Sequence, residues 1–183
     1  MKKALLITWE KFQDHEVIYP YYRLHEEGFD VDIMANVEGK ILGILGTNMD
    51  STLTVGALKN TDFFESALRD YEFLVIPGGV KALEKLRQER QVLDFVKAWN
   101  TAGKVIASTC HGAQLLISSQ VVAGRKVSGY YSIRDDINNA GATYVDAPAV
   151  VDGNLISSPH YKWMGAWMKT AIEVHNGLYV EDS

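Results

Sequence analysis

The feature that most constrains the fold is a repeated alternation of short apolar runs with longer segments of helical periodicity. Runs of strand length occur at "KALLIT", "FDVDIMAN", "YEFLVIPGG" and "KVIAST". Between them lie "DHEVIYPYYRLHEEG" and "ERQVLDFVKAWNTAG", in which apolar residues recur near helical spacing and a glycine follows the last turn. Strands separated by helices predict an α/β fold with a mainly parallel sheet that helices cover on both faces.

The second half of the chain continues this pattern. Helices are predicted at "HGAQLLISSQVVAG", "SIRDDINNAG" and "WMGAWMKTAIEVH". A strand pair is predicted around "YVDAPAVVDGNLISS", with its turn at Asp152-Gly153. The glycines between Gly39 and Lys59 break a β-rich segment, which predicts hairpin-like pieces at the edge of the sheet.

Composition narrows the class of protein further. The chain has 183 residues, of which 47% are hydrophobic and 22% are charged, and this is typical of one domain spanning 1–183. A net charge of −5 argues against nucleic-acid binding, and no apolar run is long enough to predict a membrane span. One cysteine excludes an intrachain disulfide and a multi-cysteine zinc site, and the N-terminus turns polar too early for a signal peptide. We therefore expect a cytoplasmic protein without a metal or cofactor.

The cysteine stands at a position with chemical meaning. Cys110 follows the apolar run "KVIAST" and precedes a predicted helix, and ligands of parallel sheets bind at the carboxyl ends of strands. The helix N-terminus favours a thiolate there, which predicts alkylation of the sulfur below pH 7. Gly112 leaves room for a sharp turn, and N–H groups after Cys110, with a second donor from Gly78-Gly79, are candidates to bind an oxyanion. The alternative is an inert buried thiol, since free cysteines are often buried.

Several motifs carry a resemblance that covers essentially the whole chain. They are "VIPGG", "ASTCHGAQLL", "GRKVSGY", "IRDDINNAGA" and "VVDGNLISSPH". In order and spacing they resemble the ThiJ/PfpI family of the class I glutamine-amidotransferase-like superfamily. The resemblance implies a flavodoxin-like three-layer α/β/α sandwich and a homodimer or larger homo-oligomer. It also implies a nucleophilic Cys110, an active-site Glu16 hydrogen-bonded to the sulfur, and an oxyanion site formed by the backbone of Gly79 and His111.

Other candidate residues depend on how far the resemblance extends. In the PfpI protease-like branch, the histidine after the nucleophile pairs with it and is oriented by an acid from a neighbouring subunit. Here these positions are His111 and, by a loose match, Glu84, although Glu84 also fits a solvated helix face and His111 a helical turn without catalysis. His160 falls on a family position at the pocket rim. Asp14 is predicted to cap the first helix, and His15, His25 and His175 are predicted at the surface.

The segment after "SSPH" departs from the family pattern. Many members have an arginine at the third position of this motif and a Pro-Gly-Asp run after it, whereas this chain has Pro159 and "YKWMGAWM". The change predicts a more aromatic pocket entrance suited to an apolar or planar substrate, or a tighter subunit contact. Trp163 and Trp167 are four residues apart, so they are predicted on one helix face, packed on the core or on a partner, with Trp99 as a further contact residue.

Two classes of function follow. The first is an enzyme that forms a covalent Cys110 adduct with a small-molecule or peptide substrate, as in amide or peptide hydrolysis, hydration of a carbon–nitrogen bond, or glyoxalase and deglycase chemistry. The second is a stress protein without catalysis, in which Cys110 oxidises reversibly for redox sensing or a chaperone-like role. A glutamine amidotransferase proper is disfavoured, because "SSPHYKW" has no acid two positions after its histidine.

Overall fold

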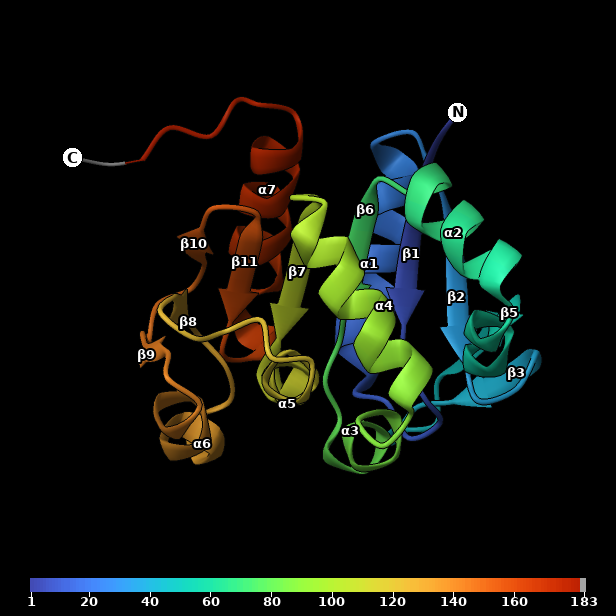
Figure 1. The fold of residues 1–183 in the computed structure, drawn as a ribbon, viewed down its shortest axis with the longest axis horizontal. Helices are drawn as coiled ribbons and strands as arrows, with labels where there is room; N and C mark the ends of the chain where they lie inside the picture. The colour runs from blue at the N-terminus through green and yellow to red at the C-terminus, as the bar shows by residue number, and fades with distance from the viewer. Residues whose placement is uncertain (182–183) are drawn as a thin grey trace.

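The computed structural model describes residues 1–181, which form a seven-stranded sheet between two layers of helices (Figure 1). Neighbouring strands are parallel except for one antiparallel pair at an edge, so the predicted flavodoxin-like three-layer α/β/α sandwich is confirmed. In spatial order the strands are β10 (Val150–Asp152), β11 (Leu155–Ser158), β7 (Val105–Thr109), β6 (Phe73–Ile76), β1 (Lys2–Ile7), β2 (Phe29–Ala35) and β5 (Leu53–Thr54). Residues 182–183 of the predicted domain lie outside the described residues.

Helices cover both faces of this sheet. On one face lie α1 (Asp14–Glu26) and α7 (Met164–His175), and on the other α2 (Thr61–Asp70), α4 (Arg90–Thr101) and α5 (Ala113–Ser118) (Figure 1). The shorter α3 (Val80–Leu86) and α6 (Arg134–Asn139) lie toward the carboxyl ends of the strands. Four 3₁₀ segments connect elements within the described residues: η1 (Val55–Lys59), η2 (Cys110–Gly112), η3 (Tyr131–Ile133) and η4 (Tyr161–Trp163).

Two small sheets complete the fold. β3 (Gly39–Leu42) and β4 (Asn48–Ser51) form an antiparallel hairpin beside the β5 edge, as the glycine-rich segment predicts. β8 (Lys126–Val127) and β9 (Thr143–Tyr144) pair in parallel near the opposite edge.

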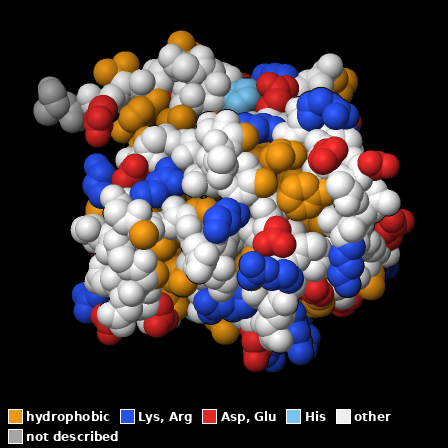
Figure 2. Space-filling model, in the orientation of Figure 1, with side chains coloured by type: hydrophobic (Ala, Val, Ile, Leu, Met, Phe, Trp, Pro, Cys, Tyr) orange, Lys and Arg blue, Asp and Glu red, His pale blue; other side chains and the backbone are white. Residues whose placement is uncertain are grey.

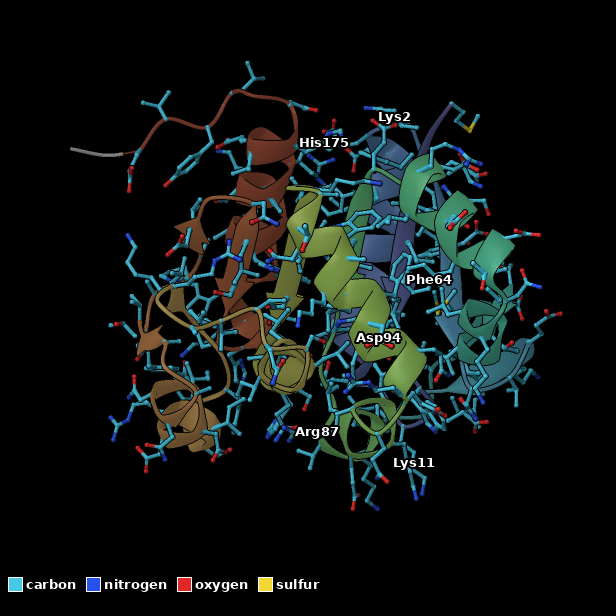
Figure 3. The ribbon with its side chains drawn as sticks, viewed as in Figure 1. Lys2, Lys11, Phe64, Arg87, Asp94 and His175 are labelled. Atoms are coloured by element: carbon cyan, nitrogen blue, oxygen red, sulfur yellow. The ribbon has the colours of Figure 1, made fainter. Side chains whose placement is uncertain are left out.

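The central strands explain the apolar runs in the sequence. Every residue of β6 and β7 is buried, because helices cover both of their faces and neither strand is at an edge. Lys11 and Arg87 lie toward the carboxyl end of the sheet, and Lys2 and His175 toward its amino end (Figure 3). Cys110 directly follows β7, so it also lies at the carboxyl end of the sheet.

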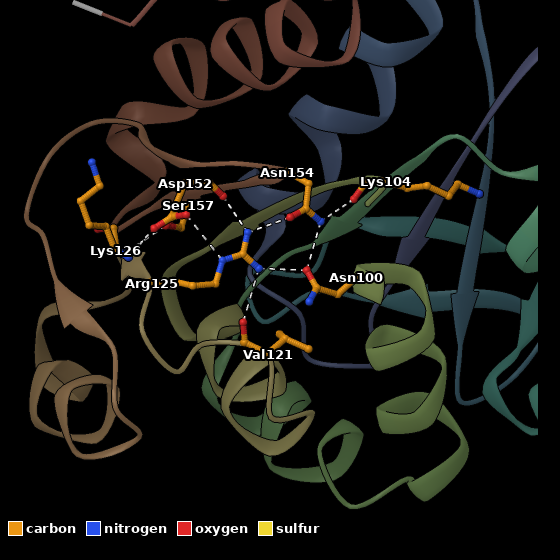
Figure 4. A network of polar contacts seen from close by, with 9 residues as sticks. Asn100, Lys104, Val121, Arg125, Lys126, Asp152, Asn154 and Ser157 are labelled. Carbon is orange, nitrogen blue, oxygen red and sulfur yellow. Dashed lines mark hydrogen bonds and ion pairs between the residues drawn. The ribbon is translucent and has the colours of Figure 1, made fainter. Parts of the chain in front are cut away.

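A polar network holds the β10 side of the sheet to α4 (Figure 4). The Arg125 guanidinium donates to the Asp152 carbonyl oxygen at 2.6 Å, to Asn154 Oδ1 at 2.7 Å and to Asn100 Oδ1 at 2.9 Å. Because Asp152 pairs with Leu155, the hairpin turns at residues 153–154, one position later than predicted.

Several helix predictions were wrong in detail. The predicted helix over 111–124 is a 3₁₀ turn followed by the short α5, and the chain leaves it through Gln120, which has a φ of +60°. α2 was not predicted, although Phe63, Phe64 and Leu68 recur at helical spacing in its segment and pack, partly buried, against the core. The cap of α1 is Gln13, whose side chain accepts a hydrogen bond from His15 N, so Asp14 is not the cap.

The tryptophans separate instead of sharing one face. Trp99 and Trp167 are fully buried in the core, where their indole N–H groups donate to the carbonyl oxygens of Val105 and Ile156. Trp163 is 36% exposed, so it alone of the three is available for contacts outside the chain. The prediction that Trp99 serves a subunit contact was therefore wrong, because its side chain is fully enclosed by the core of its own chain.

Candidate active site

Cys110 occupies a strained turn at the carboxyl end of the central strand β7. It is the first residue of η2 and has a φ of +56°, a left-handed conformation that costs a non-glycine residue about 1–2 kcal/mol. The carbonyl oxygen of Cys110 accepts a hydrogen bond from Tyr130 N at 3.0 Å, which helps to hold the turn. The side chain is 7% exposed. The predicted position of the sulfur at the turn between strand and helix therefore has the expected geometry.

The glycines around this turn allow the backbone to approach closely. A Cβ on Gly112 would lie 2.5 Å from the Ile76 carbonyl oxygen, so this glycine is needed for packing against β6, while its own φ of −55° is ordinary. Gly79 has a φ of +108°, and a Cβ there would lie 2.8 Å from Gln13 N. Gly112 thus gives room as predicted, but the strained conformation of the turn belongs to Cys110 itself.

Glu16 lies next to the thiol, as the resemblance implies. It is fully buried on α1, and its Oε1 accepts a hydrogen bond from Gly78 N at 2.7 Å. A Cβ on Gly78 would lie 2.5 Å from Glu16 Oε1 and 2.9 Å from Cys110 Cβ, so only glycine fits between them. Burial raises the pKa of Glu16 to about 7, against the lowering effects of the Gly78 N–H and the Cys110 thiol.

The pKa of Cys110 moves opposite to the direction that the helix N-terminus predicts. Burial raises this pKa, the negative charge of Glu16 raises it further, and the backbone N–H groups of His111 and Gly79 lower it by less. The sulfur and the carboxyl are thus coupled, and while Glu16 is ionised the proton stays on the thiol. Burial, the largest effect, outweighs the single helical turn, so the direction of this pKa argues against alkylation below pH 7, and the labelling itself stays a prediction.

Two backbone N–H groups face the sulfur, and these are the two expected to bind an oxyanion. They belong to His111 and Gly79. The Gly78 N–H is not available for this role, because it is bonded to Glu16. The site therefore combines a thiol, a carboxyl with a pKa near neutrality and a pair of N–H donors, all at the carboxyl edge of the sheet.

His111 also contacts the sulfur. Its Nδ1 lies 3.5 Å from Cys110 Sγ, so the two consecutive side chains converge despite standing on one turn. Burial lowers the pKa of His111, which keeps the ring neutral at pH 7 and able to accept a proton. The ring stacks on Tyr130, with 5.0 Å between centroids and 24° between planes.

Glu84 does not join this site within one chain. It is exposed on α3 and lines a separate cavity of about 420 Å³ with Trp9 and Lys11. Its assignment as an acid that acts across a subunit boundary stays a prediction.

His160 lies at the rim, joined to the site through Tyr130. The ring centroids of Tyr130 and His160 are 6.2 Å apart. His160 Nδ1 accepts a hydrogen bond from Lys162 N at 3.1 Å, and this bond caps the start of η4. Tyr130 was not predicted as a site residue, although it ends the quoted motif "GRKVSGY". The paired tyrosines after a short strand were the available signal, but only the fold brings them beside Cys110.

Asp14 holds the start of α1 in place and so positions Glu16 two residues later. Its carboxylate accepts hydrogen bonds from Leu45 N and Thr47 N, each at 2.8 Å, which join α1 to the loop between β3 and β4. Burial raises the pKa of Asp14, but these hydrogen bonds outweigh it and the net pKa is lowered. Asp14 is thus a positioning residue for the loop and not a helix cap.

The other three histidines are exposed or partly exposed. His25 and His15 are exposed, although the His15 ring stacks on Tyr161 at 4.5 Å. His175 is partly buried at the surface, with its side chain 14% exposed: its ring lies 5.2 Å from that of Phe29, and its Nε2 lies 3.6 Å from a Glu72 carboxylate oxygen.

The described part of the chain holds no cluster of three or more histidine, cysteine, aspartate or glutamate side chains arranged to bind a metal. Between residues 1 and 181 no helix has the length and apolar character needed to cross a membrane.

A cavity of about 770 Å³ between α2 and α4 contains none of the predicted site residues. Phe64 and Asp94 on its border are labelled in Figure 3, and Figure 2 shows hydrophobic side chains among charged ones on this face.

The fold and the site together define a class: α/β proteins with a cysteine at the turn between a central parallel strand and the following helix, beside a buried carboxyl. The sequence profile of the DJ-1/PfpI family matches residues 2–174. The chain belongs to the DJ-1/PfpI family, as the resemblance to ThiJ/PfpI proteins predicted.

Relatives show how close the similarity is. The chain is 40% identical over 172 residues to Deglycase PfpI of Pyrococcus furiosus, covering 94% of this chain and 98% of that protein. It is 35% identical over 150 residues to General stress protein 18 of Bacillus subtilis, covering 82% and 83% of the two chains.

A solved structure is similar as well. It is a two-domain protein from Anabaena variabilis with DJ-1/ThiJ/PfpI-like and ferritin-like domains, and it superposes with a TM-score of 0.86 at 31% identity. The match covers 97% of this chain and 48% of that chain, so this chain spans about half its length.

Proposed function

We propose that this protein is a cysteine-dependent enzyme that cleaves carbon–nitrogen bonds at carbonyl-derived carbons. Amides and the adducts of reactive carbonyls with amines both contain such a bond, and the steps below are written for the amide. The observation that carries the proposal is the buried pair of Cys110 and Glu16, with the pKa of Glu16 near 7. A relative that is 40% identical is named a deglycase, and this supports the same class.

The geometry suggests how the first step would proceed. The Cys110 thiol passes its proton to Glu16 while the sulfur attacks the carbonyl carbon, and the C–S bond forms as the C=O π bond opens. A carboxylate with a pKa near the working pH suits this transfer, which in enzymes accelerates reactions by about 10²- to 10⁴-fold. The N–H groups of Gly79 and His111 would bind the new oxyanion.

Collapse of this intermediate needs a proton on the leaving nitrogen. Glu16 holds the proton taken from the thiol and would return it as the C–N bond breaks, which releases the amine and leaves the carbonyl carbon on sulfur. Water then adds to that carbon and releases the thiol, with neutral His111, whose Nδ1 is 3.5 Å from the sulfur, as a candidate proton acceptor. The carboxyl thus serves first as base and then as acid.

The alternative is a redox-sensing or chaperone-like stress protein that uses the same thiol. A relative named General stress protein 18 favours this second candidate. Both candidates place the chemistry on Cys110, so the state of the sulfur after exposure to reactants distinguishes them.

The deciding experiment is intact-mass spectrometry of the protein during incubation with amides, glyoxal adducts of amino acids, and mild peroxide. We expect a Cys110 adduct that forms and disappears as free amine accumulates, and that is missing in Cys110→Ser. Oxygen additions with peroxide, and no amine release from any adduct or amide, would support the stress protein and refute the enzyme.

A further inference from the structure

A continuous series of aromatic rings runs from the nucleophile to the protein surface. His111, whose Nδ1 contacts the Cys110 sulfur, stacks on Tyr130, and Tyr130 lies parallel to His160 within 27°. His160 in turn contacts Tyr161, with 4.1 Å between centroids, and Tyr131, with 6.3 Å and an angle of 22°. We call the rings of Tyr130, Tyr131, His160 and Tyr161 the aromatic wall.

The segment that departs from the family pattern contributes one ring of this wall, Tyr161, which follows His160 of the matching motif. Pro159 directly follows β11, and the hydrogen bond from Lys162 N to His160 Nδ1 folds the next residues into η4. The Tyr161 ring also stacks on the His15 ring of α1, with 4.5 Å between centroids and 12° between planes, and this contact holds Tyr161 in place. The wall is therefore a built feature of this chain and not a mobile edge.

The accessible part of the wall is aromatic and carries one cation. Tyr131 is 40% exposed, and the Lys162 ammonium lies 5.8 Å from its ring centroid and 5.3 Å from that of Trp163. Burial, Lys162 and His15 lower the pKa of His160, and burial lowers the pKa of His111, so both imidazoles are neutral at pH 7. Among the groups that contact these rings, Lys162 is thus the charged one beside the aromatic wall.

We infer that Tyr131, His160 and Lys162 form a specificity subsite for a planar aromatic group that bears a carboxylate. The inference rests on the proposed role of Cys110 as nucleophile, since His111 connects the sulfur to Tyr130 of the aromatic wall. A ring of the substrate would lie on Tyr131 and His160, and its carboxylate would approach Lys162 from solvent. Substrates with small alkyl groups would gain neither contact.

Alkylation kinetics test this subsite without needing turnover. The rate of Cys110 labelling is measured with 4-(iodoacetamido)benzoate, N-phenyliodoacetamide and iodoacetamide, each divided by its rate with a free thiol. We expect the aromatic carboxylate to label fastest. Tyr131→Leu should lower the ratio of N-phenyliodoacetamide to iodoacetamide by about two- to tenfold, the usual worth of an aromatic pair.

The cation is tested by Lys162→Met, which keeps an apolar stem. It should lower the benzoate-to-phenyl ratio by about two- to fivefold, and the parent ratio should fall as salt is added, because an exposed ion pair is screened. Tyr179→Leu is the matched control: Tyr179 is 36% exposed but lines a different cavity with Lys126 and Asp152, so both ratios should stay at the parent values.

Equal normalised rates for the three reagents in the parent, or an equal loss in Tyr131→Leu and Tyr179→Leu, would overturn the subsite. Failure of the proposed function looks different. In that case the selectivity ratios and their loss in Tyr131→Leu and Lys162→Met persist, while no amine is released from any substrate.

Discussion

Replacing Glu16 with glutamine should change two properties of the site in opposite directions. Glutamine keeps the shape of the side chain and an oxygen that can accept the hydrogen bond from Gly78 N, now 2.7 Å from Glu16 Oε1. It removes the proton-transfer group and the negative charge that raises the pKa of Cys110. Turnover should therefore fall, while the thiol itself becomes easier to ionise.

The size of the turnover effect follows from the chemistry of the lost group. Loss of a positioned general acid–base lowers rates by about 10²- to 10⁴-fold, so kcat/KM of Glu16→Gln should fall by that range. The parent should also show an acidic limb. With the pKa of Glu16 at about 7, the ionised fraction rises from about one-tenth at pH 6 to about nine-tenths at pH 8, a roughly tenfold change that Glu16→Gln should abolish.

The assays are amine release under kcat/KM conditions and iodoacetamide labelling of Cys110, both between pH 5.5 and 9. At pH 8, where the parent carboxyl is ionised, Glu16→Gln should label faster than the parent because the thiol has lost its anionic neighbour. A variant that labels more slowly than the parent would refute the argument from charge. A variant with parental turnover would show that Glu16 carries no proton in the reaction.

Three further predictions use other parts of the structure. Gly78→Ala places a methyl group within 2.5 Å of Glu16 Oε1, so we expect at least a tenfold loss of kcat/KM with a native circular dichroism spectrum; parental kcat/KM would contradict the close packing. Asp14→Ala should lower the free energy of unfolding at pH 7 by about 2 kcal/mol in urea denaturation, because two backbone donors lose a charged acceptor. Since the native pKa of Asp14 is lowered, its contribution is present above the unfolded pKa and disappears as pH falls through the native pKa, so parent and variant should converge in acid. Finally, sedimentation at micromolar concentration should show at least a dimer, and Glu84→Ala should lower turnover only if that acid acts across subunits; a 20.4 kDa monomer with an active Glu84→Ala variant would rule out the intersubunit acid.

The sequence predicted the sheet because its signal is local and strong. β6 and β7 are buried on both faces, so their segments must be apolar throughout, and such runs stand out from the helices between them. The ends of helices are less evident in the sequence. α5 ends early through a turn at Gln120 that no glycine or proline marks, and α2 was missed although Phe63, Phe64 and Leu68 recur at helical spacing.

The site was predictable to the extent that its residues belong to recognisable motifs. Cys110, Glu16 and Gly79 lie in three segments far apart in the chain, and the resemblance to a known family implies that they share one site. Their positions agree with that expectation because Cys110 and Gly79 follow neighbouring parallel strands, and α1 follows a third one.

What the sequence alone determined is therefore the α/β fold class, the position of Cys110 at the end of a strand and the family. Tertiary structure decided the properties that depend on neighbours distant in sequence. Burial beside Glu16 reversed the expected direction of the thiol pKa, and the core enclosed Trp99 and Trp167. Packing of Tyr161 on α1 and of His160 against Tyr130 brought the aromatic wall into contact with His111 beside the sulfur. Ionisation and stacking are set by the local dielectric and by contacts through space, and a linear pattern of residue types carries neither.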